Sequence, residues 1–230
     1  MRRPRPEPPT LERMRYAPPG AYRLDLEVMT MTELRRRAPR ERLRAPHRLD
    51  FIALIGVTRG RCRHFVDFVP YECRAGSWVV VRPGQVHRYD TTSAWDGYQV
   101  VFRPEFLLPL QQGAAPIDSA VYASLEGLPT QVTFERAQSR AALACVVQMS
   151  LDATAGVAEG LRHPLLRHQL YSLVLRLLAA SERSPPEREP ASVQVQRFKR
   201  FRQAVERDFA RTHRVTDYAR RLGYAEKTLT

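Results

Sequence analysis

The stretch Leu49–Thr58, L-D-F-I-A-L-I-G-V-T, is an apolar run that is followed directly by Arg59-Gly60. A short apolar run that ends at a glycine is typical of a buried β-strand followed by a turn. The next segment, Arg63–Val69, has strand character again, so the sequence predicts a returning strand. We therefore expect a β-hairpin around Gly60.

Further short strands are predicted on both sides of this hairpin. Tyr22–Val28 alternates apolar and charged residues, which is the pattern of a strand with one buried face. A series of brief apolar segments follows, separated by glycine and proline, among which Pro83-Gly84 is a turn dipeptide. These segments are Glu72–Arg74, Trp78–Val81, Val86–Tyr89 and Tyr98–Phe102. Short strands at close spacing predict a small antiparallel barrel or jelly roll.

Two amphipathic helices are predicted after the strands. Arg136–Leu151 carries apolar residues at helical spacing, and Leu161–Ala180 carries a wider apolar stripe. The stripe of the second helix consists of Leu166, Leu170, Leu173 and Leu177. Because its width exceeds what one surface helix needs, these leucines are predicted to contribute to a homodimer. The alternative is that the two helices pack only within their own chain.

The expected fold class is α+β, with four segments in order. Residues 1–20 begin with four prolines in nine residues, so we expect a disordered arm. Residues 21–180 are predicted to form the barrel and its two helices. Ser181–Pro190 contains three prolines and no apolar residue, so residues 181–191 are predicted to be a linker. Residues 192–230 are predicted to form a partial all-α domain.

The stretch Val215–Thr230, V-T-D-Y-A-R-R-L-G-Y-A-E-K-T-L-T, predicts a helix-turn-helix. Thr216 suits the N-cap of the first helix, and Gly223 suits the turn that ends it. Ala219, Gly223 and Leu229 lie four and then six residues apart, which fits two helices packed around a glycine turn. An ordinary surface helix with a glycine cap is the alternative.

The sequence ends at Thr230, inside the second helix of this expected unit. We therefore expect either a truncated sequence or a natural remnant of a longer regulator. A helix of little more than one turn frays when no following segment packs against it. This chain is accordingly expected to bind DNA weakly and without sequence preference.

The composition is strongly basic, with a formal net charge of +13. All but two of the 37 basic residues, Lys199 and Lys227, are arginine. A basic balance suits a polyanionic partner such as double-stranded DNA. A solvated arginine surface has the same composition and is the alternative.

Several function classes find no support in the sequence. The three cysteines, Cys62, Cys73 and Cys145, are too few and too scattered for a disulfide framework or a zinc knuckle, and they indicate reduced thiols in the cytoplasm. No apolar run reaches about 18 residues, and the basic start lacks the apolar core of a signal peptide, so we expect no membrane association.

No nucleophile elbow, phosphate loop or paired carboxylates stand out in the sequence. We therefore predict no catalytic residues, no cofactor and no enzyme.

The segment Gly76–His87, G-S-W-V-V-V-R-P-G-Q-V-H, resembles the second motif of the cupins, a superfamily of jelly-roll barrels. In metal-dependent cupins that histidine joins an H-x-H pair and a glutamate from the preceding hairpin. Here the hairpin supplies His64 alone, so too few ligands remain and no metal site is predicted. His87 is interpreted as a hydrogen-bonded histidine at a strand end or as part of a ligand pocket.

The whole chain resembles the AraC family of transcriptional regulators. The matching residues are V-T-R-G at 57–60, P-G-Q-V-H at 83–87, F-R-P at 102–104 and Y-A-R-R-L-G-Y at 218–224. Two departures are present: Cys62 replaces the second glycine of the family's G-x-G hairpin, and the sequence ends within the first of the family's two helix-turn-helix units. The resemblance implies a cupin-like effector domain, dimerising helices, a linker and DNA-binding helices.

The resemblance also implies residue roles for a regulator that responds to a small-molecule effector. In the barrel, Arg59 and Tyr89 would contact the effector, with His87 beside them. In the C-terminal part, the residues facing the major groove would be Glu226, Lys227 and Thr230, and those meeting phosphates would be Arg211, Arg214, Arg220 and Arg221. The alternatives are a cupin-type binder or enzyme, and a regulator remnant that no longer binds DNA specifically.

Overall fold

A computed structural model of the chain describes residues 12–16, 25–107, 124–154, 158–183, 201, 204–205, 207–209 and 211–224. The chain divides into two compact units, Met1–Pro185 and Pro186–Thr230. This division falls inside the segment predicted to be a linker, most of which lies outside the described residues. Within the described residues, no helix combines the length and the apolar composition that a membrane span requires.

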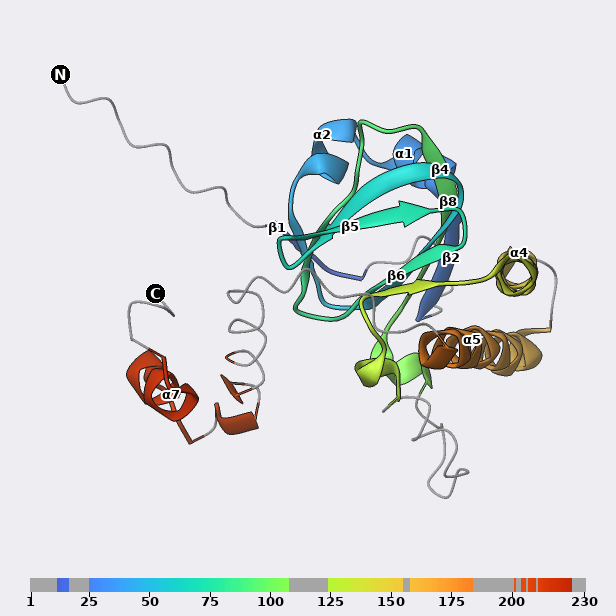
Figure 1. The fold of residues 1–230 in the computed structure, drawn as a ribbon. Coiled ribbons are helices and arrows are strands. Elements are labelled where there is room, and N and C mark those ends of the chain that lie inside the picture. Colours follow the sequence, from blue (N-terminus) through green and yellow to red (C-terminus); the bar gives the residue numbers. More distant parts are fainter. Residues whose placement is uncertain are drawn as a thin grey trace. The chain divides into compact units, whose positions relative to one another are not determined.

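The first unit is built around one long strand, β4 (Ile52–Val66), which belongs to two sheets. Its first half pairs with β6 (Ser77–Val81) and β8 (Trp95–Phe102). Its second half pairs with β5 (Val69–Arg74) and β7 (Val86–Arg88). The sheet that results curls into a barrel (Figure 1).

The expected hairpin at Gly60 is wrong, because β4 continues without interruption past this residue. Gly60 has a φ of +80°, and the pairing with β8 shifts register between Val57 and Arg59. A Cβ atom at position 60 would lie 2.2 Å from the carbonyl oxygen of Ala94. The glycine therefore permits a β-bulge and a close approach of β8, so that the strand bends from one sheet into the other.

The true turn of this hairpin lies at Asp67 and Phe68, between β4 and β5. Both residues have positive φ, 48° and 67°, which is typical of the type I′ turns that connect strands tightly. The Asp67 carboxylate accepts hydrogen bonds from the backbone N–H of Val86 (3.0 Å) and from the side chain of Gln85 (2.9 Å). These contacts hold a turn that lacks the usual asparagine and glycine.

The remaining strands complete the barrel. β2 (Leu26–Thr30) pairs with β8, and β9 (Gln131–Thr133) pairs with β6. β3 (His47–Leu49) pairs with β7, and β1 (Glu12–Met14) joins β3 in parallel. Part of the arm that was expected to be disordered is therefore a strand. The predicted α+β class, with an antiparallel barrel followed by two helices, is confirmed.

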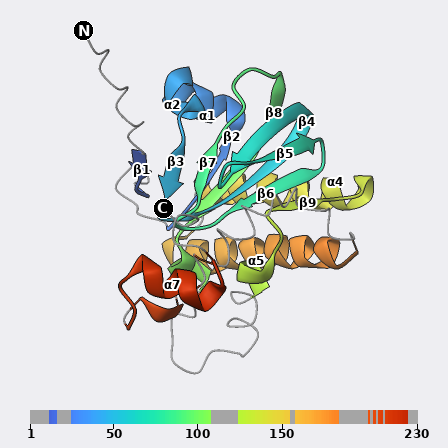
Figure 2. The ribbon, with the colours of Figure 1, turned by 60° about the vertical axis from the view of Figure 1, so that its left-hand side comes forward.

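Two short helices that the sequence analysis did not predict, α1 (Met31–Arg37) and α2 (Arg40–Arg44), lie together over one end of the barrel (Figures 1 and 2). The first begins with a capping box: the Thr30 hydroxyl accepts from the backbone N–H of Glu33 at 3.1 Å, and the Glu33 carboxylate accepts from the N–H of Thr30 at 2.7 Å. This reciprocal pair satisfies donors that would otherwise be left open at the helix start.

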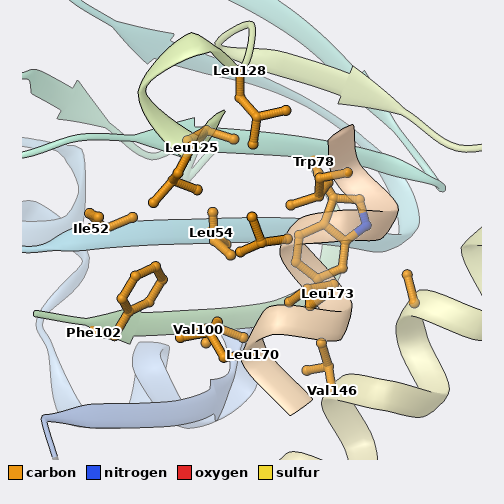
Figure 3. Close-up of a cluster of buried hydrophobic side chains, with 14 of the residues drawn as sticks. Ile52, Leu54, Trp78, Val100, Phe102, Leu125, Leu128, Val146, Leu170 and Leu173 are labelled. Atoms are coloured by element: carbon orange, nitrogen blue, oxygen red, sulfur yellow. The ribbon is translucent and has the colours of Figure 1, made fainter. Parts of the chain in front are cut away.

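The main apolar core lies between the sheet and the two long helices, α4 (Arg136–Thr154) and α5 (Glu159–Arg183). Strands β4, β6 and β8 contribute residues such as Leu54 and Trp78, which meet Leu173 of α5 in Figure 3. The short helix η1 (Pro104–Leu107) and the helical turn at residues 124–127 also border this core.

This core corrects the prediction for the α5 leucine stripe. All four stripe leucines are 0% exposed within the single chain: Leu166, Leu170, Leu173 and Leu177. They cover the apolar face of the sheet, so they are core residues and not a contact between chains. On α4 the buried residues are Ala142, Val146 and Met149, whereas Leu151 of the expected stripe is 56% exposed.

The described part of the second unit contains α7 (Val215–Leu222), which ends at Gly223 with φ 69° and ψ 30°. The backbone N–H of Tyr224 donates to the Ala219 carbonyl at 2.8 Å, as in a Schellman C-cap. The N-cap is Arg214, without a side-chain hydrogen bond, and not Thr216 as expected. Tyr218 is buried, and its hydroxyl donates to the Thr212 carbonyl at 2.8 Å.

Replacing Gly60 by alanine tests its role as the bend in β4. We expect Gly60→Ala to lower the free energy of unfolding by about 3 kcal/mol, because backbone strain and a clash with Ala94 add together. Gly84→Ala is the matched control: φ is +81° there, but a Cβ atom meets nothing within 4 Å. The control should cost only about 1 kcal/mol in urea unfolding. Equal losses for the two variants would contradict the bend.

Candidate functional site

The second half of β4 separates a buried face from an exposed one. Cys62 and His64 are buried, whereas Arg61 and Arg63 between them are exposed. β5 repeats this alternation along its whole length, as expected for strands with one face inside a barrel. The barrel interior at this end is therefore lined by polar and sulfur-containing side chains.

Three histidines from three strands meet in this interior. His47 of β3, His64 of β4 and His87 of β7 are each at most 1% exposed. The His87 Nδ1 and His64 Nε2 atoms are 3.3 Å apart, and the centroids of these two rings are 5.4 Å apart. Tyr89 packs edge-on against both rings, at 5.3 and 5.0 Å, and its hydroxyl donates to the side-chain oxygen of Gln99.

His64 and His87 are neutral at ordinary pH. Burial lowers the pKa of His64 to about 3, and burial together with the neighbouring histidines lowers the pKa of His87. Because the His87 Nδ1 and His64 Nε2 atoms are within hydrogen-bond distance and both rings are neutral, one donates an N–H to the lone pair of the other. Among the described residues, no group of three or more His, Cys, Asp or Glu side chains is placed to hold a metal ion.

A pocket of about 380 Å³ opens beside this cluster. Its wall includes residues of β4 and β5, the end of α2 and the loop after β7. The lining residues are Arg44, Arg61, Cys62, Arg63, Phe65, Glu72, Arg88, Tyr89, Asp90, Thr91, Thr92 and Ser93. The pocket therefore connects the exposed rim of the barrel with its polar interior.

The structure brings one of the three predicted effector residues to this pocket. Tyr89 lines it, and His87 lies directly behind Tyr89 without lining it. Arg59 lies elsewhere: its side chain is 84% exposed and faces the Asp96 carboxylate at 3.9 Å. The register shift at the bulge of β4 places Arg59 on the outside, away from the pocket.

The pocket carries more positive than negative charge. Arg63 pairs with Glu72, and the Asp90 carboxylate accepts hydrogen bonds from the backbone N–H groups of Arg63, Thr92 and Ser93. Burial raises the pKa of Asp90, but these hydrogen bonds and that of the Thr92 hydroxyl lower it by more. The net effect is a lowered pKa, so the Asp90 carboxyl group is ionised. Both acidic groups of the wall therefore have partners within the protein.

Three arginines of the wall make no ion pair within the described part of the chain: Arg44, Arg61 and Arg88. The Arg88 guanidinium lies 3.9 Å from the centroid of the Phe65 ring, which fixes its position at the rim. A ligand with a negative group would supply the partner that these guanidinium groups lack.

A second pocket of about 290 Å³ lies on the other side of the loop 90–93, between that loop and the helices α1 and α2. Arg40 of α2 donates to the Thr91 carbonyl, and Arg35 of α1 donates to the Trp95 carbonyl at 2.7 Å. The Trp95 indole N–H in turn donates to the Asp90 carbonyl at 2.9 Å. The two helices therefore support the loop that forms part of the pocket at Tyr89.

The sequence analysis missed this supporting structure. The capping box of Thr30 and Glu33 was the available signal for α1, and the run D-T-T-S at 90–93 was the signal for a turn. Neither signal shows that the two elements meet, because Arg35 and Trp95 are sixty residues apart in the sequence.

The candidate DNA-binding residues are only partly described. Four arginines around α7 are exposed: Arg211, Arg214, Arg220 and Arg221. Arg220 faces Asp217 at 3.8 Å, and Arg221 faces Asp208 at 3.3 Å. The predicted base-contacting residues, Glu226, Lys227 and Thr230, lie outside the described residues.

Comparison with solved structures finds chains that are similar at low sequence identity. The AraC-like transcriptional activator CuxR is similar with a TM-score of 0.38 and 12% identity, over 88% of this chain and 65% of that chain. ToxT from Vibrio cholerae is similar with a TM-score of 0.33 and 10% identity, over 79% of this chain and 66% of that chain. ToxT with a bound unsaturated fatty acid is similar with a TM-score of 0.34 and 11% identity, over 79% of this chain and 64% of that chain. This chain spans less than two thirds of the length of these proteins.

No curated protein sequence matches the chain. A family model does: the one for the AraC-like ligand-binding domain matches residues 31–194. This range begins at α1, includes the whole lining of the pocket at Tyr89 and continues beyond α5. The matched family is defined by ligand binding and not by catalysis. Because the match covers most of the sequence, the chain belongs to the family of the AraC-like ligand-binding domain.

Proposed function

We propose that this protein is a transcriptional regulator whose barrel binds a small-molecule effector and whose C-terminal helices bind DNA. The observation that carries the proposal is the pocket at Tyr89, which lies within an AraC-like ligand-binding domain. Its volume of about 380 Å³ falls in the range of small-molecule sites. Effector binding there changes how the second unit is presented to DNA.

The effector carries a negative charge in this proposal. The guanidinium groups of Arg44, Arg61 and Arg88 line the pocket without an acidic partner in the described part of the chain. Charge-assisted hydrogen bonds to a carboxylate or phosphate would compensate them. Tyr89 and Phe65 add aromatic surface, so an organic anion fits the wall better than an inorganic one.

Thermal unfolding in the presence of paired compounds tests this effector class. We expect organic carboxylates, such as benzoate and longer acids, to raise the melting temperature, whereas the corresponding neutral amides do not. Arg88→Gln should weaken the affinity for the carboxylate roughly tenfold or more, because one charge-assisted contact is lost. Arg59→Gln is the matched control and should leave it unchanged. Equal stabilisation by acids and amides, or loss only in the Arg59 variant, would refute this assignment.

DNA contact in this proposal comes from the region of α7. Arg211, Arg214, Arg220 and Arg221 are exposed and would meet phosphates, and Glu226, Lys227 and Thr230 would face base edges. α7 has the glycine turn that such a motif needs, with Gly223 in the left-handed conformation. Asp208 and Asp217 hold two of these arginines in place before DNA arrives.

Salt-dependent binding to a random-sequence DNA duplex tests the phosphate contacts. The double variant Arg211→Ala/Arg214→Ala should reduce the slope of log affinity against log salt concentration by about two, one for each lost phosphate contact. Arg48→Ala/Arg74→Ala removes the same charge from exposed positions of the barrel and should leave the slope almost unchanged. A slope that falls equally in both variants would mean that the arginines act only through net charge.

We also propose a homodimer, through a different face of α5 from the one that the sequence indicated. Leu161, Leu165 and Leu175 are 66%, 38% and 47% exposed. Their helical spacing places them on one side of α5, roughly opposite the buried leucine stripe. A second copy that covers this face would remove the three side chains from water.

Sedimentation at micromolar concentration tests the dimer. We expect the unmutated chain to sediment as a dimer and Leu175→Glu as a monomer, because the interface would then bury an unpaired carboxylate. Phe68→Glu is the control, since Phe68 is 75% exposed at the β4–β5 turn and far in sequence from α5. A monomeric unmutated chain would rule out this interface.

A further inference from the structure

Two cysteines face each other beside the effector pocket. Cys62 of β4 and Cys73 of β5 are direct partners in the antiparallel ladder, and both are free thiols. Residues directly opposite in such a ladder have Cα atoms about 4.5–5.5 Å apart. A disulfide requires about 4.4–6.8 Å between Cα atoms, so the backbone already meets this condition.

The two thiols differ in access. Cys62 lines the pocket of about 380 Å³, whereas Cys73 does not and donates instead to the Tyr71 carbonyl at 3.5 Å. A small molecule that enters the pocket therefore reaches Cys62 first. The third cysteine, Cys145, lies on α4 and donates to the Gln169 carbonyl at 3.3 Å, which makes it an internal comparison without an opposite thiol in the ladder.

We propose that Cys62 and Cys73 form an oxidative modification site, in which a hydroperoxide that enters the pocket converts the two thiols into a disulfide between β4 and β5. The Cys62 sulfur, after losing its proton to water, attacks the terminal peroxide oxygen. The O–O bond breaks, an alcohol or water leaves, and Cys62 becomes a sulfenic acid. The Cys73 sulfur then attacks the Cys62 sulfur, the S–O bond breaks, and the hydroxyl group leaves with the Cys73 proton as water while the S–S bond forms. The peroxide is reduced and the two thiols are oxidised.

The surroundings of the pair make this reaction slow near neutral pH. The neighbouring Cys73 thiol, burial, and the nearby carboxylates of Asp90 and Glu72 all raise the pKa of the Cys62 thiol. The thiolate is the reactive form, so its small population limits the first step. The rate should therefore keep rising with pH through the alkaline range, unlike that of a thiol with an ordinary or lowered pKa.

The disulfide would alter the pocket without requiring a different fold. The two strands are already paired at this position and are joined by the turn at Asp67 and Phe68. Cys62 forms part of the pocket wall beside Tyr89, so its oxidation changes the surface that an effector meets. A ligand in the pocket would in turn cover Cys62 and slow the oxidation.

Peptide mapping of the full chain tests the proposal. The reduced chain is treated with hydrogen peroxide at about pH 7 and at about pH 9, alkylated, and digested with trypsin. We expect the dipeptide 62–63 to become joined to peptide 64–74, with the loss of two hydrogen atoms, at a rate at least tenfold higher at the alkaline pH. Dithiothreitol should reverse the link, and Cys145→Ser should leave it unchanged.

Two further measurements keep the test decisive. Cys62→Ser and Cys73→Ser should each abolish the link, but the mapping of the unmutated chain is sufficient if either variant fails to fold. The same oxidation in urea, where the strands are unpaired, should give mixed links that include Cys145. Links of that mixed kind in the native chain, or a sulfinic acid at Cys62 with Cys73 still reduced, would overturn the proposal.

Discussion

The constraint on which the first unit depends is that one strand, β4, serves two sheets. Its apolar half pairs with β6 and β8 and gives Leu54 to the core under α5. Its polar half pairs with β5 and β7 and gives Cys62 to the pocket. Gly60 at the bulge allows the strand to bend between these two roles, because no other residue tolerates both the positive φ and the close approach of β8. The pocket and the core are therefore connected through continuous backbone.

For the proposed effector binding, this connection would provide a physical route to the helices. A ligand that contacts the polar half of β4 acts on a strand whose other half packs against α4 and α5. On the opposite side, the loop 90–93 is held by Arg35 and Arg40 from the short helices. The short helices are also anchored by the buried side chains of Met31 and Leu43, and the Leu43 carbonyl accepts from the backbone N–H of Tyr89 at 3.3 Å.

Local sequence signals predicted most of the long elements but not the short helices α1 and α2, and not the contacts among the elements. Trp78–Val81 was predicted because a β-branched run lies between Gly76 and Pro83-Gly84, and the structure has β6 there. The hairpin at Gly60 was wrong because a glycine marks a turn and a bulge equally well, and only the pairing with Ala94 and Trp95 distinguishes them. The periodicity of α5 correctly indicated a wide apolar face. Periodicity alone cannot tell whether a sheet of the same chain or a second chain covers that face.

At the candidate site, too, the sequence predicted residues better than it predicted their contacts. The family resemblance implied Tyr89, which lines the pocket, and Arg59, which a register shift that no local pattern reveals places outside it. The His64 Nδ1 atom is buried and has no hydrogen-bond partner among the described residues. Such an atom costs roughly 1–3 kcal/mol relative to an apolar packing of the same space. Because Tyr89 contacts the His64 ring and also lines the pocket, this cost falls at the end of the barrel that the proposed effector would occupy.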